Sequence, residues 1–233
     1  MGKLSDEVLL EIFRYHLDVF PHLWPRLVHI CRRWRRIVLS SRQALDLRLF
    51  CTHGTSVSKA LDYWPTLPIV VNFGGSSAFD PLPPEDEDNI TAVLKKSARV
   101  KSITLALPSS LLARVLGKIS AIEGPFSELE NLVLMSQHSA QLNQLTVTSY
   151  FQCGPRLRRL HLTGIVFPAL LQSISSYRNL IDLQIHDIIH NSWGFPLEAF
   201  ANALSGTPHF HSISCPSCPP HFPCPHLTDP GNV

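Results

Sequence analysis

The sequence lacks any apolar run long enough to cross a membrane. Although 45% of its 233 residues are hydrophobic, no stretch of about 18 uninterrupted apolar residues occurs, which is close to the minimum that a transmembrane helix needs. A secretory signal is not expected either, because Asp6 and Glu7 stand where such a signal has its apolar segment. We therefore expect a protein of the cytoplasm or nucleus that does not bind membranes.

The sequence also lacks a strong charge of one sign and the common catalytic motifs. A formal net charge of +2 argues against a dedicated nucleic-acid-binding protein. There is no Gly-x-Ser-x-Gly nucleophile motif, no P-loop and no dinucleotide fingerprint. We expect no catalytic residues, no cofactor, no metal and no nucleic-acid partner.

Cysteine is sparse, and its six residues are scattered. Cys31, Cys51 and Cys153 are predicted to be isolated small core residues in a reducing compartment. The C-terminal stretch 208–233 contains seven prolines, which neither continue a helix nor donate to a sheet. Phe210 and Ile213 could begin one more strand, after which we expect a disordered tail. This stretch contains residues of the types that bind zinc, namely Cys215, Cys218, His221, Cys224 and His226. The intervening prolines leave the chain little freedom to wrap an ion, and we expect no zinc site.

The N-terminus has the pattern of short amphipathic helices. Ser5 is a suitable N-cap, and Asp6 and Glu7 suit the positive end of a helix dipole. Apolar residues then recur at helical spacing in two stripes, formed by Val8, Leu9, Ile12 and Phe13 and by Leu27, Ile30, Cys31 and Trp34. So small a helical cluster cannot bury all of its apolar surface, and the surplus indicates a docking face.

These residues resemble an F-box. The opening Leu-x-x-Glu-Val-Leu-x-x-Ile-Phe spans 4–13, and the closing Ile-Cys-Arg-Arg-Trp spans 30–34. A serine replaces the usual proline after the first leucine, and the segment between the two half-motifs is a few residues longer than in compact versions. In this respect the sequence resembles F-box proteins of mushroom-forming (basidiomycete) fungi.

The resemblance implies an adaptor whose F-box docks on the linker subunit of an SCF-type cullin–RING ubiquitin ligase. The residues implied to bind that partner are Leu4, Val8, Leu9, Ile12, Phe13, Leu27, Ile30, Cys31 and Trp34. Two alternatives stay open. The helices could instead cap the main core in a scaffold without a ubiquitin role, and the arginines of 32–36 could contact phosphates rather than form a solvated helix face.

A loose repeat follows from about residue 98. Its strand-like motif has apolar residues at positions 1, 4 and 6. The motif recurs as Val100-x-x-Ile103-x-Leu105, Leu129-x-x-Leu132-x-Leu134, Leu157-x-x-Leu160-x-Leu162 and Leu180-x-x-Leu183-x-Ile185. This spacing and pattern are those of leucine-rich repeats, each contributing one strand. Helical patterns separate the motifs, at 111–119 and after Pro168 and Pro196. Such an array would hold an unknown substrate protein.

The segment before the repeats is predicted to contain strands at 45–49 and 67–71, where apolar residues alternate. Residues 81–89, rich in proline and acids, are predicted to form a loop before a helix at 90–96. His186 and His190 are interpreted as turn residues. We therefore predict an α+β protein with an F-box helical domain at 1–43, a connecting segment with the first repeat-like strands at 44–97, an irregular leucine-rich-repeat solenoid with a parallel sheet at 98–207 and the tail at 208–233. An ordinary α/β domain without repeats is the alternative.

Overall fold

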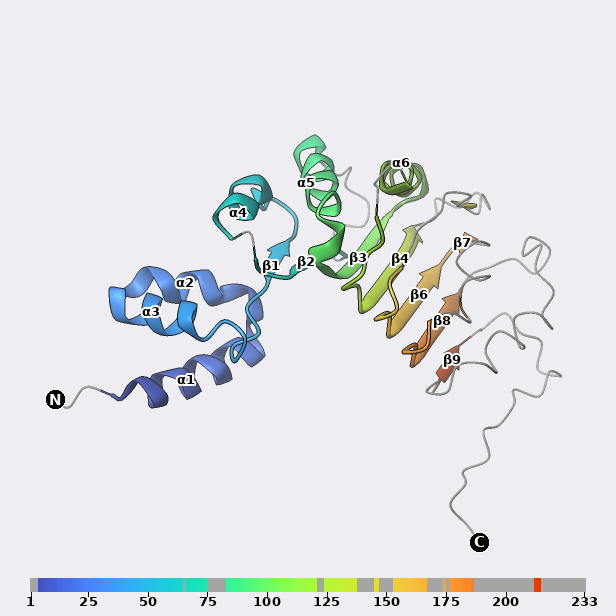
Figure 1. Ribbon diagram of the computed structural model, residues 1–233. Coiled ribbons are helices and arrows are strands. Elements are labelled where there is room, and N and C mark those ends of the chain that lie inside the picture. The colour runs from blue at the N-terminus through green and yellow to red at the C-terminus, as the bar shows by residue number, and fades with distance from the viewer. Residues whose placement is uncertain are drawn as a thin grey trace, which may run out of the picture.

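The computed structural model describes residues 4–64, 66–74, 83–120, 124–137, 145–146, 153–166, 174, 177–186 and 212–214. The fold is α+β: a cluster of short helices at the N-terminus is followed by a parallel sheet with helices on one face (Figure 1). No helix in this described part is both long and apolar enough to span a bilayer.

The N-terminal cluster contains α1 (Asp6–Val19), the 3-10 helix η1 (Pro21–Leu23), α2 (Trp24–Ile30) and α3 (Arg32–Ser40). Ser5 caps α1 as its sequence position predicts, because its hydroxyl accepts a hydrogen bond from the Val8 amide. Pro21 and Pro25 each stand in the first turn of the next helix, where the missing amide hydrogen costs nothing.

Within the described ranges, the main sheet has seven parallel strands that are neighbours in the order in which they occur in the chain. They are β1 (Leu49–Cys51), β2 (Ile69–Phe73), β3 (Val100–Pro108), β4 (Asn131–Gln137), β6 (Arg159–Thr163), β8 (Asp182–His186) and β9 (Ser212–Ser214). A second, small sheet pairs β5 (Leu145–Thr146) with β7 (Ile165–Val166). The parallel sheet predicted from the repeating strand motif is therefore present.

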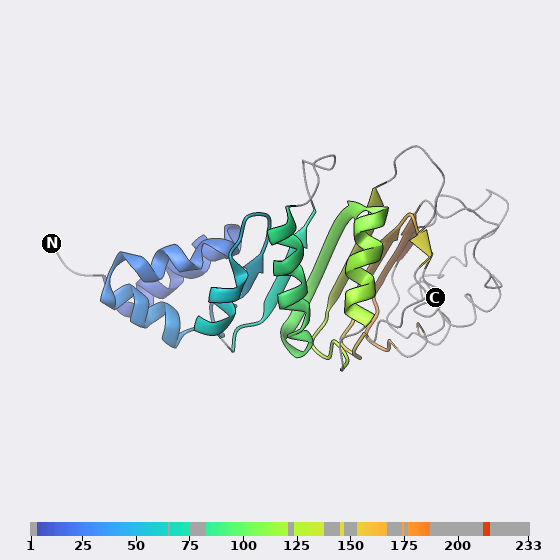
Figure 2. The same ribbon diagram turned by 90° about the horizontal axis from the view of Figure 1, so that it is seen from above.

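Helices cover one face of the main sheet. α4 (Val57–Tyr63), α5 (Pro84–Leu94) and α6 (Ser109–Ser120) lie side by side over β1 to β4, and η2 (Ser97–Arg99) leads into β3 (Figures 1 and 2). The predicted helix at 111–119 thus lies within α6. Leu105, Leu134, Leu162 and Ile185 are aligned across four strands, and all are buried. This row explains why the repeat motif needs an apolar residue at that position of every strand.

Two predicted boundaries were wrong. The strand predicted at 45–49 begins only at Leu49, because residues 41–46 form turns and Asp46 has a left-handed φ of 44°. The loop predicted at 81–89 is helical from Pro84 onward, and α5 ends at Leu94. Proline at the start of a helix and acids in its first turn both favour helix formation there.

Other predictions fall on residues that the structure does not describe. These include the helix that follows Pro196, residue His190 and the cysteine- and histidine-rich stretch after 214. His186, predicted in a turn, is instead the last residue of β8. The additional strand expected around Ile213 is confirmed as β9. β9 pairs with β8 in parallel and extends the sheet by one more strand.

Candidate docking surface on the N-terminal helices

Helix α1 has two apolar faces, and one of them forms the core of the helical cluster. Leu9, Phe13 and Leu17 recur every four residues and are all buried. The Phe13 ring packs against Trp34 of α3 with a centroid distance of 4.7 Å. This face therefore holds α1 against the other helices.

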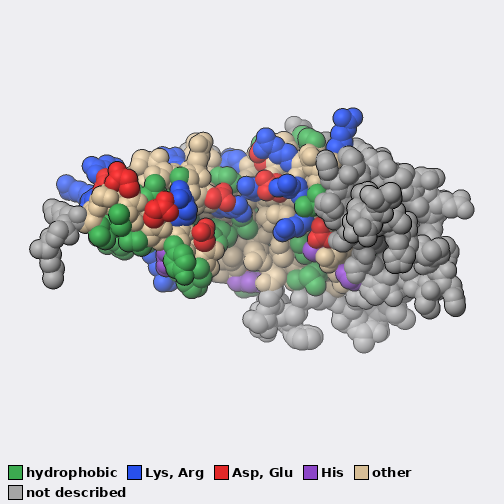
Figure 3. All heavy atoms as spheres, turned by 90° about the horizontal axis from the view of Figure 1, so that it is seen from below, with side chains coloured by type: hydrophobic (Ala, Val, Ile, Leu, Met, Phe, Trp, Pro, Cys, Tyr) green, Lys and Arg blue, Asp and Glu red, His purple; other side chains and the backbone are tan. Residues whose placement is uncertain are grey.

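The second apolar face of α1 is exposed. It consists of Leu4, just before the helix, and of residues that follow at helical spacing, which we call the α1 stripe. Its members and their exposed fractions are Leu4 52%, Val8 45%, Ile12 47%, Tyr15 77% and Val19 56%. The spacing of 4, 4, 3 and 4 residues places all five on one side of the helix, and Figure 3 shows a hydrophobic patch over this end of the molecule. Helices usually turn such a stripe toward a core or a partner.

The structure separates the nine residues that the F-box resemblance implied into two groups. Exposed are Leu4, Val8, Ile12, Ile30 and Cys31, whereas Leu9, Phe13 and Leu27 are buried and Trp34 is half-buried. The first group is available to a partner. The second group holds the helices together, so a substitution such as Leu9→Asp would test folding rather than docking.

Two further observations refine the sequence analysis. Cys31, predicted in the core, is exposed because it lies in extended conformation between α2 and α3. Tyr15 and Val19 are absent from the predicted docking residues, although they continue the spacing that Val8 and Ile12 begin. Extending the period by two more turns would have identified them.

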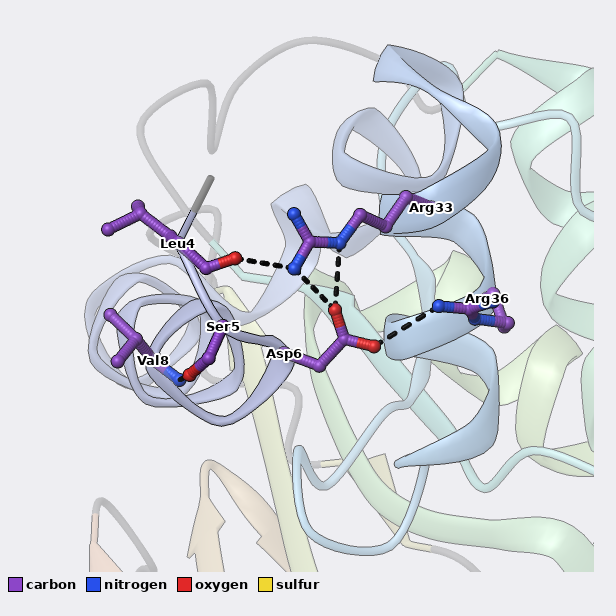
Figure 4. A network of polar contacts seen from close by, with 6 residues as sticks. All are labelled: Leu4, Ser5, Asp6, Val8, Arg33 and Arg36. Atoms are coloured by element: carbon purple, nitrogen blue, oxygen red, sulfur yellow. Dashed lines mark hydrogen bonds and ion pairs between the residues drawn. The ribbon is translucent and has the colours of Figure 1, made fainter. Parts of the chain in front are cut away.

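The start of α1 is fixed to α3 by charged groups (Figure 4). The Arg33 Nε donates to Asp6 Oδ1 at 2.7 Å, and its Nη2 donates to the Leu4 carbonyl oxygen at 2.5 Å. The Arg36 Nη2 donates to Asp6 Oδ2 at 3.1 Å. The hydrogen bond from Arg33 to Asp6, and to a smaller extent the one from Arg36, lowers the pKa of the Asp6 carboxyl group. The network sets the orientation of α1 and of its stripe.

Three of the four arginines of 32–36 form hydrogen bonds within the helical cluster. Besides the two that bind Asp6, Arg35 donates from Nε to the Val28 carbonyl oxygen at 2.9 Å. These contacts give Arg33, Arg35 and Arg36 a structural role that needs no phosphate ligand.

Trp24 joins the helical cluster to the sheet region. Its side chain is buried, its Nε1 donates to the Arg48 carbonyl oxygen at 2.7 Å, and its ring meets Trp64 edge-on at a centroid distance of 5.1 Å. Arg48 directly precedes β1, and Trp64 follows α4. The buried residues of the helices and of the sheet accordingly form one continuous hydrophobic cluster.

A second surface is the sheet face opposite the helices. Residues that alternate with the buried rows lie there in register, such as Thr104, Val133, His161 and Gln184. His161 Nε2 lies 2.9 Å from Asp182 Oδ2 of the next strand. These four side chains are partly exposed, and this face is a second candidate surface for a partner.

The described residues contain no candidate metal site, and two of their three cysteines are held in the interior. No group of three or more His, Cys, Asp or Glu side chains is placed to hold a metal ion within the described ranges. Burial raises the pKa of both Cys51 and Cys153 to about 12, which keeps their thiols protonated. These two cysteines belong to the interior, as predicted.

Comparison with protein-family models, curated proteins and solved structures found no match to this chain. The features that bear on function are the α1 stripe, the sheet face and the contacts that hold the helices together.

Proposed function

We propose that this protein is a non-catalytic, substrate-recognition adaptor of an SCF-type cullin–RING ubiquitin ligase. In this proposal the N-terminal helices are an F-box that docks on the linker subunit. The parallel sheet is an irregular leucine-rich-repeat solenoid, and it binds a substrate protein. The observation that carries the proposal is the exposed α1 stripe.

The stripe supports docking for an energetic reason. Fully burying a Val, Leu or Ile side chain contributes about 1.5–3 kcal/mol, and each stripe residue still exposes roughly half of its surface or more. Burying all five against a partner would release several kcal/mol, enough for a few of them to dominate the affinity. The charged network at Asp6 adds to this, because it presents the stripe on a helix of fixed orientation.

The remaining surface fits the second task of an adaptor. The sheet face opposite the helices carries partly exposed side chains from four neighbouring strands, which supports a role in binding a protein segment. Catalysis would come from other subunits, with the adaptor raising the effective concentration of substrate beside the ligase. Such a protein would work in the cytoplasm or nucleus, without cofactor, metal, nucleic acid or membrane.

Co-purification with the linker subunit tests the proposal. The variant Val8→Asp combined with Ile12→Asp places two charges on the stripe and leaves the buried face of α1 intact. The matched control is Tyr63→Asp, because Tyr63 is 78% exposed on α4, away from α1. Wild type and Tyr63→Asp should retain the linker, and the double variant should lose it. Equal recovery with all three proteins would overturn the proposal.

The contacts of Trp24 favour a second candidate, a protein-interaction scaffold without a ubiquitin role, whose N-terminal helices cap the solenoid. Removal of a cap exposes the apolar end of a repeat array. Because the helices and the sheet share one hydrophobic cluster, a fragment of residues 45–207 should unfold or aggregate under either candidate. Linker binding by the full chain therefore discriminates: the scaffold should not bind the linker subunit, and the adaptor should.

A further inference from the structure

The residues that flank the α1 stripe differ between its two sides. On one side, Leu9 and Phe13 each follow a stripe residue by one position and are buried in the core of the helical cluster itself. His16 and Phe20, which follow Tyr15 and Val19 in the same way, are half-buried and 46% exposed. The acidic and arginine side chains that directly precede stripe residues lie along the opposite border. The chemistry of that border decides which partner surfaces fit.

The opposite border is acidic. Glu7, Glu11 and Asp18 each precede a stripe residue by one position, namely Val8, Ile12 and Val19, and all three acids are exposed. A step of one residue is about 100° around a helix, so the acids form a row parallel to the stripe. Figure 3 shows acidic side chains along one side of the hydrophobic patch. We call Glu7, Glu11 and Asp18 the acidic row.

One basic residue lies in the same row. Arg14 precedes Tyr15 in the same way and forms an ion pair with Glu11 at 2.6 Å. Both side chains are exposed, and such a pair contributes little in water, so a partner can replace it at small cost. The row keeps three negative charges against one positive charge.

We propose, as an extension of the adaptor function above, that the surface seated on α1 is an apolar groove with basic side chains along one edge. The groove takes the stripe, and the basic edge faces the acidic row. Complementary charge at the rim of an interface mainly raises the association rate and excludes wrong partners. The acidic row therefore selects the docking surface, whereas the stripe provides most of the affinity.

The row also disfavours a second copy of this chain as the occupant. If two α1 helices paired about a two-fold axis and ran antiparallel, the same border of each would meet the other. The acidic row of one copy would then lie against the acidic row of the other, and like charges in that position oppose association.

The test measures association rates with the purified linker subunit at low and high ionic strength. The variant Glu11→Lys with Asp18→Lys reverses the row, and the control Asp62→Lys with Asp88→Lys makes the same change of net charge at exposed sites of α4 and α5. The row variant should associate about tenfold more slowly at low salt, and this difference should shrink as salt screens the charges. The control should associate within about twofold of wild type.

Three outcomes would overturn the inference. The first is equal rates for the row variant and wild type while Val8→Asp with Ile12→Asp abolishes binding; docking through the stripe would then stand without charge selection. The second is equal slowing by the control, which would indicate a net-charge effect. The third is a wild-type homodimer, seen by sedimentation, that the stripe variant dissociates. If the stripe variant binds the linker as wild type does, the proposed function itself fails.

Discussion

Trp24 provides the sharpest test of how the helical cluster is joined to the sheet. Its buried ring packs edge-on against Trp64, and its Nε1 donates to the Arg48 carbonyl oxygen. Trp24→Ala should lower the free energy of unfolding by about 3–5 kcal/mol, because it removes a large buried ring and leaves a cavity. Trp24→Phe keeps most of the ring but removes the donor, which should lower it by about 1–2 kcal/mol.

Urea denaturation followed by circular dichroism measures both values. Because helices and sheet share one hydrophobic cluster, each variant should unfold in a single transition at a lower urea concentration. Tyr63→Ala, at an exposed position, should change the free energy by less than about 0.5 kcal/mol. The reasoning would be refuted if Trp24→Ala split the curve, leaving the sheet transition where wild type has it, or if its effect stayed below about 1 kcal/mol.

Two other predictions concern the sheet region. Hydrogen bonds from Arg114 and then Lys118 lower the pKa of Glu87 from its ordinary value of 4.5, so this carboxylate stabilises the fold above that pH, and the contribution is lost as pH falls through the lowered value. Glu87→Gln should lower the free energy of unfolding by about 1 kcal/mol at neutral pH, and the difference from wild type should shrink in denaturation curves measured below about pH 4; a constant difference would contradict this. Gly154→Ala would place a Cβ 2.7 Å from the Phe126 carbonyl oxygen and should lower stability by about 1–3 kcal/mol. Its control in thermal melts is Gly117→Ala, where a Cβ meets nothing within 4 Å and an alanine favours the helix; a similar melting temperature for both would contradict the predicted clash.

The parts that the sequence predicted best are those with a long, regular period. The motif around Leu105, Leu134 and Leu162 recurs with the spacing of a parallel array, and the structure aligns these residues in one buried row. The apolar period of α1 was equally clear. Period alone, however, does not say which apolar side of a helix is buried, so Leu9 and Ile12 looked equivalent in the sequence although only Leu9 is in the core.

The predictions that failed involved local signals with two meanings. A proline next to acidic residues, as at Pro84, is typical of a loop as well as of a helix start. The contacts of the Asp86 side chain hold this segment against the rest of the fold as a helix. This carboxylate is buried and accepts a hydrogen bond from the Gly54 amide, a contact between residues far apart in the chain. Trp24 likewise gave no sign in the sequence that its partners would be Arg48 and Trp64.

Photocrosslinking from α1 tests the central claim, that the α1 stripe is the docking face. Tyr15 and Tyr63 are 77% and 78% exposed, so a photoreactive phenylalanine analogue can replace either one with little effect on folding. Irradiation of the purified complex should link the linker subunit to position 15 and not to position 63. Crosslinks from position 63 alone, or from neither position in a complex that co-purifies, would contradict docking through the stripe.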